Sequence, residues 1–178
     1  MNKKTVSLFI GVCAVLLLGL SIFQYKNFVL SQGISQSTGK IISGSFDGSK
    51  VKTNAEWKKI LTPAQYTIVR DAGTEIPFTG KLENENRKGT YYSVGCNDPI
   101  FRSEQKYNSG TGWPSFWAPI NSNSLVLRED DSIPGSLRIE VLDKCGGHIG
   151  HVFDDGPQPT GKRYCMNSEA MYFVPDNK

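Results

Sequence analysis

This sequence contains little histidine and little cysteine, and its net charge is small. Two histidines and four cysteines occur among its 178 residues. Three of the 20 basic residues flank an apolar N-terminal run, which leaves 17 basic against 17 acidic residues elsewhere. Such a balanced chain has no electrostatic footprint for nucleic acid, and we expect no nucleic-acid partner. Chemistry that needs an imidazole or a thiol is confined to very few positions.

Acidic residues are missing from the first 30 positions, where the uncharged apolar run Thr5–Phe23 lies. The run is long enough to span a bilayer as a helix. Lysines precede it, so the positive-inside tendency leaves the N-terminus cytoplasmic and exports the remainder. Cleavage near Ser21 or Ser31 is the alternative, but both are poor signal-peptide exits. We expect an uncleaved signal anchor over residues 1–30 and an extracytoplasmic protein, in the periplasm or at the cell surface.

The rest of the chain divides into a spacer and one domain. Residues 31–54 are rich in Ser, Gly, Gln and Thr and lack sustained periodicity, which predicts a flexible linker. The domain is predicted over residues 55–178. It starts with helical spacing, and Thr62-Pro63 is typical of an N-cap followed by proline in the first turn. Gly73 is expected to end that helix.

Beyond Pro77 the pattern changes to short apolar or alternating runs separated by Gly, Pro, Asn and Asp. These runs, which predict strands joined by turns and longer loops, are TYYSV, SLVLRE, SLRIEVL, HIGHVF and AMYFV. The domain is therefore predicted to be mainly antiparallel β, with a short helical N-terminal part.

Both histidines lie in one stretch, His148–Asn167, together with Cys165, Arg163 and a pair of aspartates. A lone cysteine between tyrosine and methionine is usually a small buried hydrophobe. A cationic neighbour or a protonated histidine instead stabilises the reactive thiolate, which favours a nucleophile here. The amide of Asn167 can hydrogen-bond a substrate or orient a histidine.

His148 and His151 are three residues apart, so a flat strand would point them to opposite faces. Gly150 between them predicts a bulge or turn that re-aims one ring. Cys145 extends the pair to C-x2-H-x2-H, and Cys96 could supply a fourth ligand to tetrahedral zinc. The spacing is unlike familiar zinc fingers. A zinc-binding structural or interaction domain without catalysis is the alternative to an enzyme.

The segment Asn108–Phe116, NSGTGWPSF, is a glycine-rich loop followed by aromatic residues. Its aromatic side chains either fill the core or form a platform for a ligand, and Trp113 is the candidate for the second role.

Three stretches together resemble the B-type methionine sulfoxide reductases, which reduce the R epimer of methionine sulfoxide. They are LTPAQYTIVRDAGTEIPFTGKL, GTGWPSF and HIGHVFDDGPQPTGKRYCMNS, and the likeness extends from about Glu56 to Val174. The resemblance implies two antiparallel sheets with the site on one sheet face. We expect a monomer with no bound cofactor or metal, acting on oxidised proteins and methionine-R-sulfoxide.

The resemblance also implies roles for individual residues. Cys165 is the nucleophile that attacks the sulfoxide sulfur, and Trp113 receives the substrate methyl group, with Phe153 as a second substrate-binding residue. His151 is our first choice for the acid that protonates the oxygen. Cys165 then becomes a sulfenic acid, which a second thiol must reduce. The other polar site residues implied are His148, Asp155, Arg163 and Asn167.

The chain departs from the family pattern at that second step. Thr111 stands where many members carry the cysteine that resolves the sulfenic acid. We therefore expect an external thiol reductant, thioredoxin-like in the cell or dithiothreitol in vitro, to act on Cys165.

Two CxxC pairs that bind structural zinc in many members are each reduced to one cysteine, Cys96 and Cys145. In the zinc-bearing relatives both positions ligate the same ion and lie close together. We therefore expect Cys96 and Cys145 to form a disulfide, which suits an oxidising compartment. The alternative is that one of them resolves the sulfenic acid of Cys165.

Overall fold

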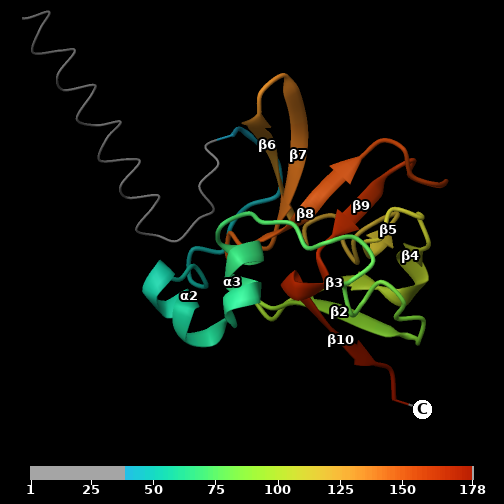
Figure 1. Cartoon of the computed structure of the whole chain (residues 1–178), viewed down its shortest axis with the longest axis horizontal. Helices are drawn as coiled ribbons and strands as arrows, with labels where there is room; N and C mark the ends of the chain where they lie inside the picture. Colours follow the sequence, from blue (N-terminus) through green and yellow to red (C-terminus); the bar gives the residue numbers. More distant parts are fainter. Residues whose placement is uncertain (1–38, 178) are drawn as a thin grey trace, which may run out of the picture.

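The computed structural model describes residues 39–177, which fold into two antiparallel sheets and two short α-helices (Figure 1). Among these residues, no helix has both the length and the apolar character to cross a bilayer. The predicted anchor over residues 1–30 lies outside the described part. The prediction of a mainly β domain with two antiparallel sheets is confirmed.

The larger sheet has seven strands, in the spatial order β1 (Ile41–Ser43), β6 (Val126–Ile133), β7 (Ser136–Leu142), β8 (His148–Phe153), β9 (Arg163–Met166), β5 (Ser115–Phe116) and β4 (Lys106–Tyr107). The smaller sheet has the order β10 (Met171–Pro175), β2 (Gly89–Ser93) and β3 (Pro99–Arg102). Single-turn 3-10 helices occur at Ser103–Gln105 and Ser168–Ala170.

The two α-helices, α2 (Asn54–Ile60) and α3 (Pro63–Val69), each begin with a capping box. Thr53 caps α2 and Thr62 caps α3, and each hydroxyl accepts the backbone N–H three residues later. The predicted N-cap at Thr62 is confirmed. Such caps satisfy helix N–H groups that otherwise lack partners, so these seven-residue helices are fixed at their starts.

The predicted end of α3 at Gly73 is wrong, because the helix ends at Val69. Ala72 already has a left-handed backbone, with φ of 53°. The N–H of Gly73 donates back to the carbonyl of Thr67. Gly73 therefore closes the turn that follows the helix, and it is not the residue at which the helix ends.

The predicted flexible linker is wrong for Ile41–Ser43, which form β1 and pair with β6 at the edge of the larger sheet. The segment that follows is also tied down, since the N–H of Asp47 donates to the carbonyl of Lys144. Three exposed residues are too few to produce a recognisable alternation in a Ser/Gly-rich stretch.

The core lies between the two sheets and is strongly aromatic. Phe116 of β5 stacks on Phe101 of β3 at 4.2 Å and meets the edge of Tyr91 of β2 at 4.9 Å. All three side chains are fully buried. In the loop NSGTGWPSF, Phe116 therefore fills the core, as the first interpretation has it, while Trp113 remains half-buried at the surface. The aromatic packing anchors β5, whose neighbour β9 carries Cys165.

Candidate active site

One row of directly opposed residues crosses five strands of the larger sheet. Cys165 of β9 lies opposite Ser115 of β5 and His151 of β8. Tyr107 of β4 continues the row on one side, and Glu140 of β7 continues it on the other. Opposed residues of antiparallel strands project from the same face, with Cβ atoms about 5 Å apart. The row therefore places a thiol between hydroxyl groups and an imidazole.

A β-bulge brings the second histidine to the same face. Consecutive residues of β7 pair with Gly150 and His148, so Ile149 is an extra residue in β8. The imidazole rings of His148 and His151 consequently lie with centroids 5.3 Å apart. The bulge predicted at this glycine is confirmed.

A hollow of about 90 Å³ opens at Cys165. Five of the predicted site residues line it: Cys165, His151, Trp113, Phe153 and Asn167. Thr74 and Arg138 also line it and were not predicted. Cys165 is the free cysteine of the described residues, and its half-buried side chain reaches this hollow.

Burial raises the pKa of the Cys165 thiol above its usual value. The hydroxyl of Thr111, whose Oγ1 is 3.9 Å from Sγ, opposes the shift, and so do Arg163 and Ser115. Arg163 therefore acts in the predicted direction, but desolvation outweighs it. A raised pKa favours the thiol over the thiolate, which is the reactive form.

His151 carries the imidazole that the row places beside this thiol. Its Nε2 lies 2.7 Å from a carboxylate oxygen of Asp130, and Arg138 donates to the same oxygen at 2.6 Å. Burial lowers the pKa of His151, although the carboxylate of Asp130 opposes the shift. Burial alone would raise the pKa of Asp130, but hydrogen bonds from Ser132 and His151 hold it below its usual range. His151 is thus an oriented, neutral imidazole beside an anion.

His148 belongs to a second buried network behind His151 and does not line the hollow. Its Nδ1 lies 2.8 Å from Glu140, whose other carboxylate oxygen accepts from Arg128 at 2.6 Å. Burial alone would raise the pKa of Glu140, but His148 and Arg128 hold it below its usual value. The predicted site residue His148 therefore lies beside His151 and contacts Glu140, but it does not reach the hollow.

Asp155 and Arg163 also lie beside the hollow rather than in it. Asp155 accepts two hydrogen bonds from the guanidinium of Arg163, each 2.8 Å long. The guanidinium lies over the ring of Phe153 at 4.4 Å. This arrangement holds Phe153 against one wall of the hollow and places positive charge near Sγ.

Glu75, which the sequence did not reveal, fixes the opposite wall. Its carbonyl accepts from the indole N–H of Trp113 at 3.0 Å, and its N–H donates to Asn167 at 3.0 Å. The amide of Asn167 also donates to the carbonyl of Ile149 at 2.9 Å. Asn167 therefore links the main chain at Glu75 to β8 through hydrogen bonds.

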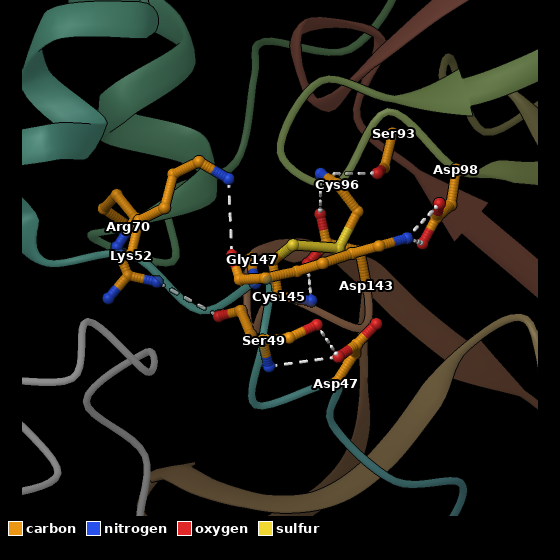
Figure 2. The surroundings of a disulfide bond; sticks show 12 residues. Asp47, Ser49, Lys52, Arg70, Ser93, Cys96, Asp98, Asp143, Cys145 and Gly147 are labelled. Carbon is orange, nitrogen blue, oxygen red and sulfur yellow. Dashed lines mark hydrogen bonds and ion pairs between the residues drawn. A yellow bond between two sulfur atoms is a disulfide. The ribbon is translucent and has the colours of Figure 1, made fainter.

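The structure joins Cys96 and Cys145 in a disulfide, as the first alternative for these residues has it, with Cα atoms 5.5 Å apart (Figure 2). Asp143 lies beside the sulfur atoms and accepts N–H groups of both cysteines. Burial raises the pKa of Asp143. Within residues 39–177, neither histidine shares a cluster of metal-capable side chains with these sulfurs. The four candidate zinc ligands are thus not brought together.

Comparison with known proteins gives consistent matches. A family model described as the SelR domain matches residues 61–175. The chain is 51% identical over 123 residues to the peptide methionine sulfoxide reductase MsrB of Leptospira interrogans, which covers 68% of this chain and 93% of that protein. It is similarly 51% identical over 123 residues to the MsrB of Methanosarcina barkeri, covering 68% of this chain and 86% of the relative. The mitochondrial methionine-R-sulfoxide reductase B2 of Danio rerio is 43% identical over 152 residues, which is 82% of each chain.

Proposed function

The chain belongs to the B-type methionine sulfoxide reductases, and from that premise we propose which role each residue of its site has in the reaction. The enzyme is an oxidoreductase that reduces methionine-R-sulfoxide to methionine. The observation that carries the assignment of residues is the hollow at Cys165. It joins a free thiol, an imidazole and an indole in one place.

The reaction starts with proton transfer from the thiol of Cys165 to His151. The imidazolium that forms is stabilised by the carboxylate of Asp130, which explains why a neutral base is held against an anion. Sγ then bonds to the sulfoxide sulfur, and the imidazolium returns the proton to the sulfoxide oxygen. The protonated oxygen then moves from the substrate sulfur to Sγ: the Sγ–O bond forms as the S–O bond and the bond between the two sulfur atoms break. Methionine leaves with its sulfur reduced by two electrons, and Cys165 is oxidised to a sulfenic acid.

Trp113 and Phe153 form the apolar walls that receive the methyl group of the substrate. Both line the hollow, and both are held from behind, Trp113 by the carbonyl of Glu75 and Phe153 by Arg163. Rigid aromatic walls fix the methyl group and exclude bulk water, which favours one epimer at sulfur.

An external thiol completes the cycle. Thr111 lies next to Sγ but carries no sulfur, and the other two cysteines of the described part are bonded to each other. A thioredoxin-like dithiol or dithiothreitol therefore reduces the sulfenic acid directly, and the enzyme needs no bound cofactor.

We place this monomeric enzyme outside the cytoplasm, tethered to the membrane by its N-terminal segment. The apolar run Thr5–Phe23 and the lysines before it support the tether. The disulfide supports an oxidising compartment, where oxidised proteins are the substrates to repair.

Turnover of the separate R and S epimers, with dithiothreitol and with a thioredoxin, tests the assignment. We expect reduction of the R epimer alone, with either donor, and complete loss of turnover in Cys165→Ser. Full activity of Cys165→Ser would end this mechanism. Activity with dithiothreitol but none with any dithiol protein would overturn the choice of reductant alone.

A further inference from the structure

The hairpin of β6 and β7 ends in an exposed apolar turn, which we call the hairpin tip (residues 133–137). The side chains of Ile133 and Leu137 are 46% and 66% exposed, and no residue of the tip carries a charge. A Cβ atom added at Gly135 would meet no heavy atom within 4 Å beyond its chain neighbours. The hairpin projects beyond the body of the domain (Figure 1). Packing within the described residues therefore does not account for large apolar side chains at this tip.

The apolar surface extends across the three adjacent strands at one edge of the larger sheet. Four of the eight large apolar side chains that are exposed in the described residues lie on β1, β6 and β7, namely Ile41, Ile42, Ile133 and Leu137. Isolated exposed apolar side chains are ordinary on a folded protein. A group of them in one region is instead typical of a surface that contacts a protein or a membrane.

The described chain also begins at this edge of the sheet. The carbonyl of Lys40 accepts the N–H of Glu129, and β1 is antiparallel to β6. The chain therefore enters β1 from the side on which β6 turns into β7. Only residues 24–38 separate Gly39 from the apolar run that ends at Phe23. The hairpin tip thus lies on the side of the domain that the chain reaches from the proposed anchor.

We propose that the hairpin tip docks onto the lipid bilayer that holds the anchor, with Ile133 and Leu137 in its interfacial layer. The inference rests on the proposed tether, because so small a tip is too weak to bind a bilayer alone. Even a single myristoyl chain binds membranes only marginally, whereas a tethered surface has a high effective concentration at its target. The flanking charges are of both signs, Asp131 before the tip and Arg138 after it. Apolar burial, and not attraction to anionic lipid, therefore drives the docking.

Docking through the tip leaves the hollow at Cys165 open. Arg138 lines the hollow and follows Leu137 directly in the chain. Successive side chains of a strand point to opposite faces, so Leu137 points away from the face that carries the hollow. The bilayer then fixes the orientation of the domain and holds the hollow close to sulfoxides at the membrane surface.

The test places an indole at the tip of the full-length chain. Leu137→Trp is reconstituted in phosphatidylcholine vesicles with and without bromine on the acyl chains, since bromine quenches indole fluorescence only at close range. Ile60→Trp is the matched control, because Ile60 is 54% exposed and ends α2, a different element. The parent chain gives the quenching of the native tryptophans. Leu137→Trp combined with Ile133→Asp tests whether the second apolar side chain of the tip is needed.

We expect bromine to quench Leu137→Trp more strongly than the parent, to the same extent in low and in high salt. Ile60→Trp and the double variant should show only the quenching of the parent. All variants should keep the parent's kcat/KM for dissolved N-acetyl-methionine-R-sulfoxide, because none of the three positions lines the hollow at Cys165.

Parent-level quenching of Leu137→Trp in a chain that floats with the vesicles overturns the docking and leaves the tether in place. Extra quenching of Ile60→Trp equal to that of Leu137→Trp, or loss of the extra quenching in high salt, also overturns it. A chain that does not float with the vesicles refutes the tether and the docking together, whereas a parent without turnover refutes the enzymatic function alone. A dimer in detergent that Ile133→Asp dissociates would assign the tip to a second copy of the chain and overturn the choice of lipid.

Discussion

At the scale of single residues, the contact between Asp130 and His151 has a measurable consequence. The carboxylate favours the imidazolium, so it raises the pKa of His151 against the effect of burial. In Asp130→Asn this support is lost, and the pKa of His151 falls further. Turnover rises with pH as His151 becomes a neutral base, so we expect this acidic limb of kcat/KM to move to lower pH.

The same variant should be slower at its optimum, by about tenfold or more, because proton transfer from Cys165 then yields a less stable imidazolium. The pH profile of kcat/KM checks both effects. Asp131→Asn, at the exposed neighbouring position, is the control and should leave the profile in place. A slower Asp130→Asn enzyme with an unmoved limb would mean that Asp130 serves only the fold.

The difference between predicted and observed site residues is also a matter of individual contacts. Cys165, His151 and Trp113 are distinctive residue types, so the sequence could single them out. Glu75 contacts Trp113 and Asn167 through its main chain, and nothing in its residue type reveals these two contacts. Asp130 could have been found, because Arg128 and Asp130 alternate on one strand and Arg138 and Glu140 alternate on the next, which is the pattern of cross-strand ion pairs.

At the scale of elements, β6 and β7 form a ladder of opposite charges under the site. Arg128 opposes Glu140, and Asp130 opposes Arg138. The pair of Arg128 and Glu140 is almost fully buried. Removing one member of such a pair leaves the other charge uncompensated, which typically costs about 3–5 kcal/mol.

We therefore expect Glu140→Gln to lower the free energy of unfolding at pH 7 by about 3 kcal/mol, as measured in urea. The carboxylate pKa of Glu140 is depressed by folding, so its contribution is present at neutral pH and is lost as pH falls through the folded-state pKa. The stability difference between parent and variant should shrink in acid. Glu104→Gln, which affects an exposed ion pair, is the control and should change stability less. A difference that persists unchanged at low pH would contradict this account.

The elements themselves could be predicted where periodicity or caps are strong. The short strands β3, β4 and β5 lie outside the runs that were predicted as strands. The strands β2, β6, β7, β8 and β10, the cap at Thr62 and the bulge beside Gly150 do follow from local sequence. The three-residue strand β1 does not, because its place is set by pairing with β6 rather than by its own pattern. The early end of α3 is likewise set by the turn that Ala72 and Gly73 close.

At the scale of the whole molecule, the disulfide links the segment after β2 to the one between β7 and β8. It closes 49 residues of sequence without touching the hollow at Cys165. The disulfide restricts the conformational freedom of the unfolded chain, so we expect it to raise the free energy of unfolding by about 2–4 kcal/mol. We expect Cys96→Ser and Cys145→Ser each to lower the unfolding free energy by that order and to retain turnover with dithiothreitol. Loss of turnover by a folded single variant, or a mapped disulfide between Cys165 and either partner, would show a resolving role.

The proposed tether also limits where the enzyme can act. The described domain begins at Gly39, so 15 residues, 24–38, separate it from Phe23, at the end of the apolar run. Even a fully extended chain of that length spans no more than about 55 Å. Under the proposed tether, we therefore expect the active site to stay close to the membrane surface, where substrates would meet a raised local enzyme concentration.

We expect the full chain to sediment with membranes after washing in high salt, and its intact mass to retain the apolar run. A variant lacking residues 1–30 should remain in the supernatant with the same kcat/KM for an end-blocked sulfoxide peptide, because every residue that lines the hollow at Cys165 lies beyond residue 70. With a sulfoxide protein fixed to vesicles, the full chain reconstituted in the same vesicles should be faster than the truncated enzyme at equal concentration. A full-length product that is soluble and begins near residue 22 or 32 would mean that the segment is a cleaved export signal, and the proximity advantage would then be absent.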